Sequence, residues 1–298
     1  MTIADEIKRL KKEKNAIILA HNYQSPEIQD LSDFTGDSLE LAIVAKNAKE
    51  DIIVLCGVMF MAETAKILNP SKKVLIPAED AGCPLADYLT AEKVRAAKEK
   101  YPKAKVVLYV NSTADSKSEA DIVCTSANAV SVCESLDSDT ILFGPDSNLA
   151  SWVAEKLPYK KIIPLPADGH CPLHAEFKPS DAKEAKERGY TVVCHPECPK
   201  AVRDECDVVA STGQMIKEAV KSDKWAVMTE KDMVHRLKKE FPDKEFLGFE
   251  TAVCRDMKLI TPDMLKKTLE DEMPEIILSD EIIKSAGSAI ERMIKIKK

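Results

Sequence analysis

The chain has 298 residues, of which 45% are apolar and 31% charged, and its formal net charge is −7. That length can bury a large core, while the negative charge argues against a nucleic-acid partner. The longest apolar stretch, residues 52–62, is too short to span a bilayer, so we expect no membrane partner either. The start of the chain lacks the apolar core of a signal peptide, which predicts a cytoplasmic protein whose nine cysteines stay reduced.

Helical and strand patterns alternate along the chain, which predicts an α/β fold with parallel, buried strands. The pattern occurs in three similar segments of the chain, which we call passes. In the first pass we expect strands at 16–20, 52–56 and 74–77 and helices at 37–48 and 61–68. The last of these strands leads into a loop that carries Cys83.

The same pattern then restarts twice. The strands expected in the second pass are 106–110, 121–124, 140–143 and 162–166, and the loop after them carries Cys171. Those expected in the third pass are 191–194, 208–210, 226–228 and 246–249, followed by Cys254. The remainder, from Met257, is rich in helical pattern and is expected to pack back on the core.

The three loop cysteines recur at a nearly constant spacing. Cys83 lies 88 residues before Cys171, and Cys254 lies 83 residues after it. A period near 85 residues is typical of a triplicated α/β domain, because it is far longer than a solenoid repeat. We therefore expect three αβα domains with parallel sheets. Their boundaries would be 1–84, 85–172 and 173–256, with a helical segment at 257–298.

Three thiolates from three domains would leave a fourth metal position open. Ligands of parallel sheets bind beyond the carboxyl ends of the strands, so three sheets facing one axis would bring the cysteines together. Zinc or a four-iron cluster with one open iron would both suit such a site, and the residues alone leave this choice open. The remaining cysteines are expected to be small buried apolar residues: Cys56, Cys124, Cys133, Cys194, Cys198 and Cys206.

Polar side chains follow many of the apolar strands. They are His21, Tyr23, Tyr109, Asn111, Ser126, His195, Glu197, Ser211 and Thr212. Histidines, hydroxyls and an amide are the groups that hold a carboxylate or phosphate, and helix N-termini near Ser126 and Thr212 would favour the same charge. Glu197 stands beside a histidine and is the natural proton shuttle. These residues predict an enzyme with an open metal or cluster site and a small anionic substrate.

Several of these motifs together resemble the quinolinate synthase family. The resemblance includes Gly169-His170-Cys171 and His195-Pro196-Glu197-Cys198-Pro199. Further matching motifs lie at residues 21–24, 36–39, 60–63, 109–113, 125–129, 143–146 and 211–213. The motifs run in order over essentially the whole chain, and a shared fold alone would not produce them.

The resemblance implies an activity and a cofactor. Members of the family condense iminoaspartate (iminosuccinate) with dihydroxyacetone phosphate to give quinolinate, phosphate and water in NAD biosynthesis. They carry a [4Fe–4S] cluster on three cysteines that match Cys83, Cys171 and Cys254. Their three αβα domains surround a pseudo-threefold axis. The substrate would come from an aspartate oxidase or dehydrogenase that makes iminoaspartate.

The resemblance also implies residue roles. Glu197, Tyr23 and Tyr109 would be catalytic. The residues implied to contact substrate are His21, Ser38, Tyr109, Val110, Asn111, Ser126, His195, Pro196, Glu197 and Thr212. His170 and His174, on either side of Cys171, are expected to matter less than His21 and His195.

The chain departs from the family pattern in places. Met59 replaces a usual acidic residue, Arg255-Asp256 follow Cys254 in place of the usual sequence, and no Cys-x-x-Cys motif lies near Cys254. The alternatives to a quinolinate synthase are a cluster-dependent hydro-lyase, a diphthamide-type enzyme, and a non-enzymatic iron–sulfur or zinc sensor. The many polar strand ends favour an enzyme over a sensor.

Overall fold

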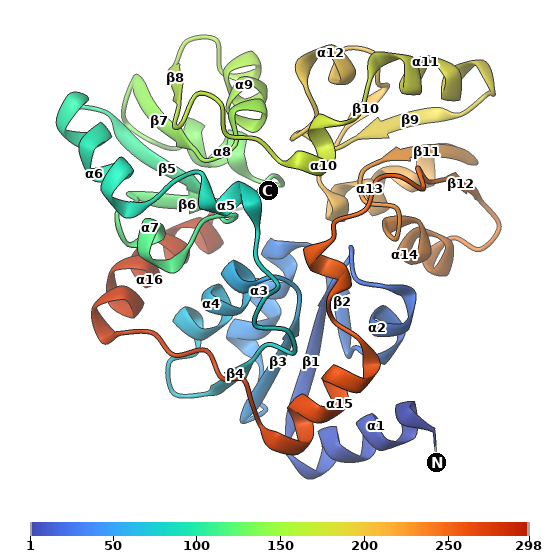
Figure 1. Cartoon of the computed structure of the whole chain (residues 1–298). Helices are drawn as coiled ribbons and strands as arrows, with labels where there is room; N and C mark the ends of the chain where they lie inside the picture. Colours follow the sequence, from blue (N-terminus) through green and yellow to red (C-terminus); the bar gives the residue numbers. More distant parts are fainter. Residues whose placement is uncertain (1, 297–298) are drawn as a thin grey trace.

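The computed structural model describes residues 2–296 and contains three parallel four-stranded sheets with flanking helices. Figure 1 shows three lobes, one for each sheet, arranged around a common centre. This confirms the expected fold of three αβα units, which we number in chain order. No helix in the described part of the chain is long and apolar enough to cross a membrane.

The first unit has the strand order β2-β1-β3-β4. Its strands are β1 (Ala16–His21), β2 (Phe34–Gly36), β3 (Ile52–Cys56) and β4 (Lys73–Leu75). Its helices are α1 (Ile3–Glu13), α2 (Pro26–Leu31), α3 (Ser38–Asn47) and α4 (Met59–Leu68). All five residues of β3 are buried, as expected for a central parallel strand covered on both faces.

The second unit repeats this order as β6-β5-β7-β8. Its strands are β5 (Lys105–Tyr109), β6 (Ile122–Cys124), β7 (Thr140–Gly144) and β8 (Lys161–Pro164). Its helices are α5 (Pro84–Asp87), α6 (Ala91–Lys100), α7 (Ala114–Ser118), α8 (Ala129–Glu134) and α9 (Ser147–Lys156).

The third unit has the order β10-β9-β11-β12. Its strands are β9 (Thr191–Cys194), β10 (Val208–Val209), β11 (Lys224–Met228) and β12 (Glu245–Leu247). Its helices are α10 (Pro172–Ala175), α11 (Pro179–Glu187), α12 (Lys200–Arg203), α13 (Thr212–Glu218), η1 (Ala219–Lys221) and α14 (Met233–Glu240). One strand order used three times is the structural form of the sequence repeat.

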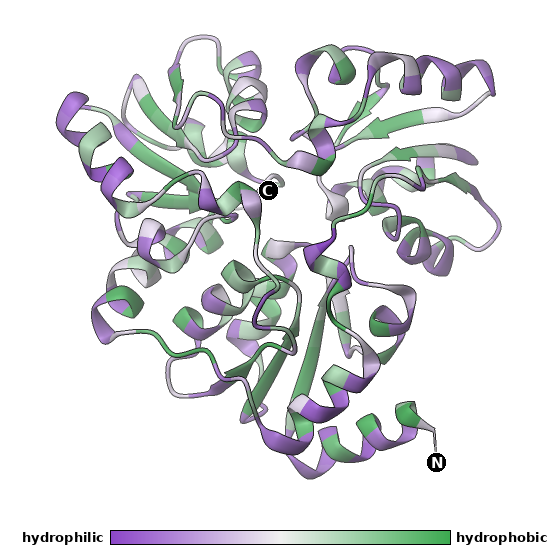
Figure 2. Cartoon of the chain, viewed as in Figure 1, coloured by the Kyte–Doolittle hydropathy of each residue, from purple (hydrophilic) through white to green (hydrophobic). Residues whose placement is uncertain are grey.

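The segment after Cys254 packs on the earlier units. It contains η2 (Asp256–Lys258), α15 (Pro262–Asp271) and α16 (Asp280–Lys295). Helix α15 contacts α1, while α16 packs against α4 of the first unit and α7 of the second. Figure 2 shows the apolar strands enclosed by helices whose outer faces are polar. The C-terminal helix thus joins the first and second units.

Most expected elements occur with small shifts in their ends. Helix α4 begins at Met59 rather than residue 61, and β12 ends at Leu247 rather than residue 249. Strand β2 was not expected, because it has only three residues and ends at Gly36. The short helices α5 and α10 were also missed; each begins at a proline directly after a cysteine.

Candidate active site

The carboxyl ends of the three sheets surround a cavity of about 410 Å³. The expected site residues that line it are His21, Tyr23, Ser38, Tyr109, Asn111, Ser126, His195, Glu197, Thr212, Cys83, Cys171 and Cys254. Val110 and Pro196 are buried and do not belong to the lining. All three units therefore contribute polar groups to one shared space.

The three cysteines of the cavity occupy equivalent positions. Cys83 precedes α5, Cys171 precedes α10, and Cys254 lies just before η2. Each thiol accepts a hydrogen bond from the backbone N–H three residues further on, at Ala86, His174 and Met257 respectively. Hydrogen bonds of this kind stabilise a thiolate.

Burial acts in the opposite direction on these thiols. It raises the pKa of Cys83 and Cys171 above the usual range and that of Cys254 to about 11. Without a cation the three groups are thiols at neutral pH. A bound metal would displace their protons, because metal ligation requires the thiolate.

The spacing of the sulfurs bears on the kind of metal centre. Among the described residues, one group of three or more potential ligands has all its ligand atoms within 4.8 Å of one another: Cys171, His174 and Glu197. The three cysteine sulfurs do not form such a group, whereas sulfurs on one tetrahedral zinc lie about 3.8 Å apart. This arrangement suits a larger centre better than one ion on all three cysteines.

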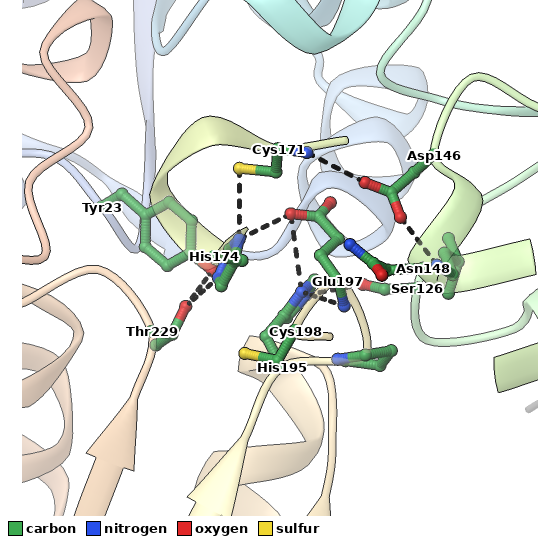
Figure 3. A network of polar contacts seen from close by, with 12 residues as sticks. Tyr23, Ser126, Asp146, Asn148, Cys171, His174, His195, Glu197, Cys198 and Thr229 are labelled. Atoms are coloured by element: carbon green, nitrogen blue, oxygen red, sulfur yellow. Dashed lines mark hydrogen bonds and ion pairs between the residues drawn. The ribbon is translucent and has the colours of Figure 1, made fainter. Parts of the chain in front are cut away.

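Glu197 is the charged centre of the cavity wall (Figure 3). Its Oε2 lies 2.7 Å from His174 Nδ1 and 3.7 Å from His195 Nδ1, and Tyr109 also hydrogen-bonds to it. Burial alone would raise the pKa of Glu197. The two histidines and the hydrogen bonds from His174 and Tyr109 outweigh burial and lower this pKa to about 2. Glu197 is therefore a carboxylate at neutral pH.

A line of hydrogen bonds connects Glu197 to Tyr23 (Figure 3). The Tyr23 hydroxyl lies 2.5 Å from Thr229 Oγ1, which lies 2.8 Å from His174 Nε2. When His174 donates from Nδ1 to Glu197 and accepts at Nε2, Thr229 donates to Nε2 and Tyr23 donates to Thr229. One consistent set of proton positions thus joins the phenol to the carboxylate.

His21 and His195 are arranged alike in the first and third units. His21 Nδ1 accepts a hydrogen bond from the backbone N–H of Tyr23 at 3.1 Å, and His195 Nδ1 accepts one from that of Glu197 at 3.3 Å. Burial lowers the pKa of both histidines to about 3, although the charge of Glu197 opposes this. Both rings are therefore neutral and carry their proton on Nε2. They can donate to an anion without carrying a positive charge.

Hydroxyls at helix starts add further donors to the cavity. Ser38 is the first residue of α3, Thr212 is the first residue of α13, and Ser126 precedes α8. The starts of α3 and α13 meet closely, since a Cβ on Gly213 would lie 2.5 Å from Asp37 Oδ2. Free backbone N–H groups at helix N-termini favour bound anions. The cavity is thus suited to carboxylates or phosphate.

The loop that carries Cys171 is fastened to α9 of the second unit. Asp146 caps this helix by accepting from the Leu149 N–H at 2.6 Å, and its other oxygen accepts from the Cys171 N–H at 3.1 Å. Gly169 approaches the same region so closely that a Cβ there would lie 2.0 Å from the Pro145 carbonyl oxygen. The position of Cys171 therefore depends on α9.

Three residues of this network were missed from the sequence as parts of the site: His174, Thr229 and Asp146. His174 was expected to matter less than His21 and His195, but it lines the cavity and contacts Glu197. Its spacing of three from Cys171 on α10 was an available signal, because helical residues i and i+3 share a face. His170, the other neighbour of Cys171, lies outside the lining and contacts Tyr88.

Comparison with known proteins gives one consistent family. Residues 5–295 match the family described as Quinolinate synthetase A protein. The chain is 52% identical over 301 residues to the quinolinate synthase of Pyrococcus horikoshii, covering 100% of both chains. It is 52% identical over 297 residues to that of Thermotoga maritima and 51% over 293 residues to that of Thermococcus onnurineus, covering 99% and 97% of both chains respectively.

Proposed function

Because the chain belongs to the quinolinate synthase family, the enzymes that make quinolinate for NAD biosynthesis, we propose that it condenses iminoaspartate with dihydroxyacetone phosphate to quinolinate, phosphate and water. The observation that carries this proposal is the cavity shared by three units. It combines three equivalent thiols with neutral histidines and helix N-termini. Such a cavity suits a substrate pair that brings two carboxylates and a phosphate.

We propose that Cys83, Cys171 and Cys254 hold a [4Fe–4S] cluster. The thiols come one from each unit or its following loop, each accepts a backbone N–H, and the three sulfurs do not all lie within 4.8 Å of one another. When bound, a cluster with three cysteine ligands supplies an open iron that acts as a Lewis acid on a substrate oxygen or nitrogen. The backbone N–H groups would hold the thiolates that such a cluster needs.

The protein groups around the cluster site would bind and orient the substrates. His21 and His195 donate from Nε2, and Ser38, Ser126 and Thr212 present hydroxyls at helix starts, with Asn111 adding an amide. Neutral donors suit this task, because they bind carboxylates and phosphate and leave no buried cations uncompensated when the products depart. Tyr109 would contact substrate beside Glu197, and Val110 and Pro196 would support the lining from behind.

Glu197 would accept and return the protons that the condensation and dehydration release. Its carboxylate lies in the cavity wall, and the hydrogen-bonded line through His174 and Thr229 ends at the Tyr23 hydroxyl. A shift of one proton position along this line, from Tyr23 through Thr229 and His174 to Glu197, would let Glu197 give a proton to one substrate atom while the Tyr23 oxygen takes a proton from another, which restores the starting arrangement. The buried setting would keep water from competing with these transfers.

A second candidate is a single metal ion on Cys171, His174 and Glu197, whose ligand atoms lie within 4.8 Å of one another. A thiolate, an imidazole and a carboxylate are ligands that zinc accepts. Such a site would leave Cys83 and Cys254 without a role and would engage the carboxylate that we assign to proton transfer. Zinc in place of iron and sulfide would favour this candidate.

The test is anaerobic purification with iron, sulfide and zinc counts, followed by incubation with iminoaspartate and dihydroxyacetone phosphate. We expect about four irons and four sulfides per chain and formation of quinolinate. Cys171→Ala should lose cluster and activity together, whereas Cys206→Ala, a half-buried cysteine outside the cavity, should keep both. A colourless, zinc-loaded and inactive wild-type protein would overturn the assignment.

Two further parts of the proposal concern cellular setting. Iminoaspartate would come from an aspartate oxidase or dehydrogenase, and we propose the cytoplasm as the compartment. Nine free cysteines are compatible with a reducing environment.

A further inference from the structure

The side chain of Arg203, the last residue of α12, is nearly fully buried between the second and third units, with 1% of its surface exposed. Its Nη1 donates to the Cys198 carbonyl oxygen at 2.7 Å and to that of Pro196 at 3.4 Å, which are the carbonyls on either side of Glu197. A buried cation that hydrogen-bonds to a loop on both sides of one residue restrains that residue.

The same guanidinium reaches across to α9 of the second unit. Nη1 donates to the Asn148 carbonyl oxygen at 3.2 Å, while Nη2 donates to Ser151 Oγ at 3.2 Å and to Glu155 Oε1 at 2.6 Å. Asn148 and Cys198 lie near Glu197 in Figure 3. Arg203 therefore spans two units with one planar group, a task for which guanidinium is better suited than ammonium.

Helix α9 is also the element that holds the Cys171 loop. Its capping residue Asp146 accepts from the Cys171 N–H at 3.1 Å. The loop that carries Glu197 and the loop that carries Cys171 are thus both tied to one helix, the first through Arg203 and the second through Asp146. This common attachment fixes the carboxylate relative to the cysteine.

We propose that Arg203 is a positioning residue that sets the distance between Glu197 and the Cys171 side of the cavity. It does not line the cavity and touches no reacting group. Its effect on turnover rests on the proposed function, whereas its effect on the loop does not. Loss of the guanidinium should let the loop at residues 195–198 move, so that Glu197 spends less time in a productive position.

The experiment compares Arg203→Gln and Arg203→Lys with Arg95→Gln, an exposed arginine that pairs with Glu119 on the surface of the second unit. For Arg203→Gln we expect at least a tenfold fall in kcat with KM within twofold of wild type. We also expect faster amide hydrogen exchange at His195, Glu197 and Cys198, the residues of this loop that carry an amide hydrogen. The kcat and exchange rates of Arg203→Lys should lie between those of wild type and Arg203→Gln, because an ammonium keeps the charge but lacks the planar set of N–H donors. Arg95→Gln should match wild type.

The exchange measurement keeps this inference separate from the proposed function. If the wild-type protein makes no quinolinate, the proposed function fails, and exchange at the amides of His195, Glu197 and Cys198 still decides the role of Arg203. Wild-type exchange at these residues in both Arg203 variants would overturn the inference. So would an equal increase of exchange in all three units, because that would show general destabilisation rather than positioning.

A variant of Glu155, the residue of α9 that accepts from Arg203 Nη2, tests the attachment further. Glu155→Gln keeps an oxygen for Nη2 and removes the charge, so we expect less than a threefold effect on kcat alone. Combined with Arg203→Gln it should add nothing further, because the charge of Glu155 acts on the loop only through the Arg203 guanidinium. Independent, multiplying effects would contradict the attachment through α9.

Discussion

Glu197 keeps its charge in a buried wall because His174 and Tyr109 donate to it and two histidines surround it. Glu197→Gln preserves the shape and the hydrogen-bonding oxygen and removes the charge. We expect a folded protein with full iron content whose kcat falls by about 10²–10⁴, the range typical of a lost general base. Steady-state assays of quinolinate formation, iron counts and thermal melting measure the three properties.

Glu205→Gln is the matched control, because Glu205 lies in the same unit and pairs with Lys183 at the surface. It should behave as wild type. Wild-type turnover in Glu197→Gln would remove Glu197 from the mechanism, and loss of iron in that variant would make it a metal ligand instead.

The line from Tyr23 to Glu197 predicts coupling between residues of different units. Thr229→Val removes the hydroxyl between Tyr23 and His174 without changing the side chain's size. We expect Thr229→Val and Tyr23→Phe each to lower kcat by about tenfold or more, and the double variant to be no slower than the slower single variant. Additive losses in this double-mutant cycle would show that the two hydroxyls act independently.

Much of the site could be predicted at the residue scale, since parallel strands place the residues that follow them at one edge. His21, Asn111, Ser126 and His195 were found in this way. Thr229 also follows a strand, but it is not among the polar strand-end residues predicted to form the site. His174 is ranked below His21 and His195 because those two follow strands directly, although its spacing of three from Cys171 was an available signal.

At the scale of elements, α9 is a common point of attachment. Its capping residue Asp146 binds the Cys171 loop, and its Asn148 carbonyl binds Arg203. Asp146→Ala removes both the cap and the acceptor for the buried Cys171 N–H. We expect a loss of roughly 2–3 kcal/mol in the free energy of unfolding, combining a lost cap with an unsatisfied donor. Reduced iron content should accompany it, because the loop loses its attachment. Urea unfolding and iron counts are the measurements.

Thr90→Ala provides the comparison for this variant. Thr90 caps α6 by accepting from the Lys93 N–H at 3.4 Å and has no contact with the cavity lining. Its replacement should cost about 1 kcal/mol and leave the iron content unchanged. Equal iron loss in the two variants would show that stability, rather than the link to Cys171, governs cluster retention.

Elements with a strong apolar pattern were predictable, including the short strands β6 and β10, whereas short elements without such a pattern were not. The central strands β1, β3 and β5 are continuous apolar runs, which the sequence displays directly. Strand β2 and the helices α5 and α10 are three or four residues long, so no period can develop within them. Their formation depends on the neighbours that they pair with or follow.

At the scale of the whole molecule, Lys258 joins distant parts of the chain near the cavity. Its ammonium donates to the backbone carbonyl of Tyr23 in the first unit. It also lies 2.8 Å from Glu230 Oε1 and 2.6 Å from Asp232 Oδ2 in the third unit. Since Glu230 follows Thr229 directly, this cluster supports both hydroxyls of the line to Glu197. We expect the buried Glu230 of this cluster to make the stability of the protein depend on pH.

Glu230 is fully buried, and burial raises its pKa from 4.5 to about 7 in spite of the neighbouring Lys258. Between these two values the folded protein keeps a proton that the unfolded chain has lost, so stability falls as pH rises from about 4.5 to 7. Glu230→Gln resembles the protonated form and lacks this loss. We expect the wild type to lose roughly 3 kcal/mol relative to this variant over that window, as measured by unfolding at several pH values. The exposed Glu250→Gln should show no such pH-dependent difference, and a constant offset between wild type and Glu230→Gln would contradict the shift.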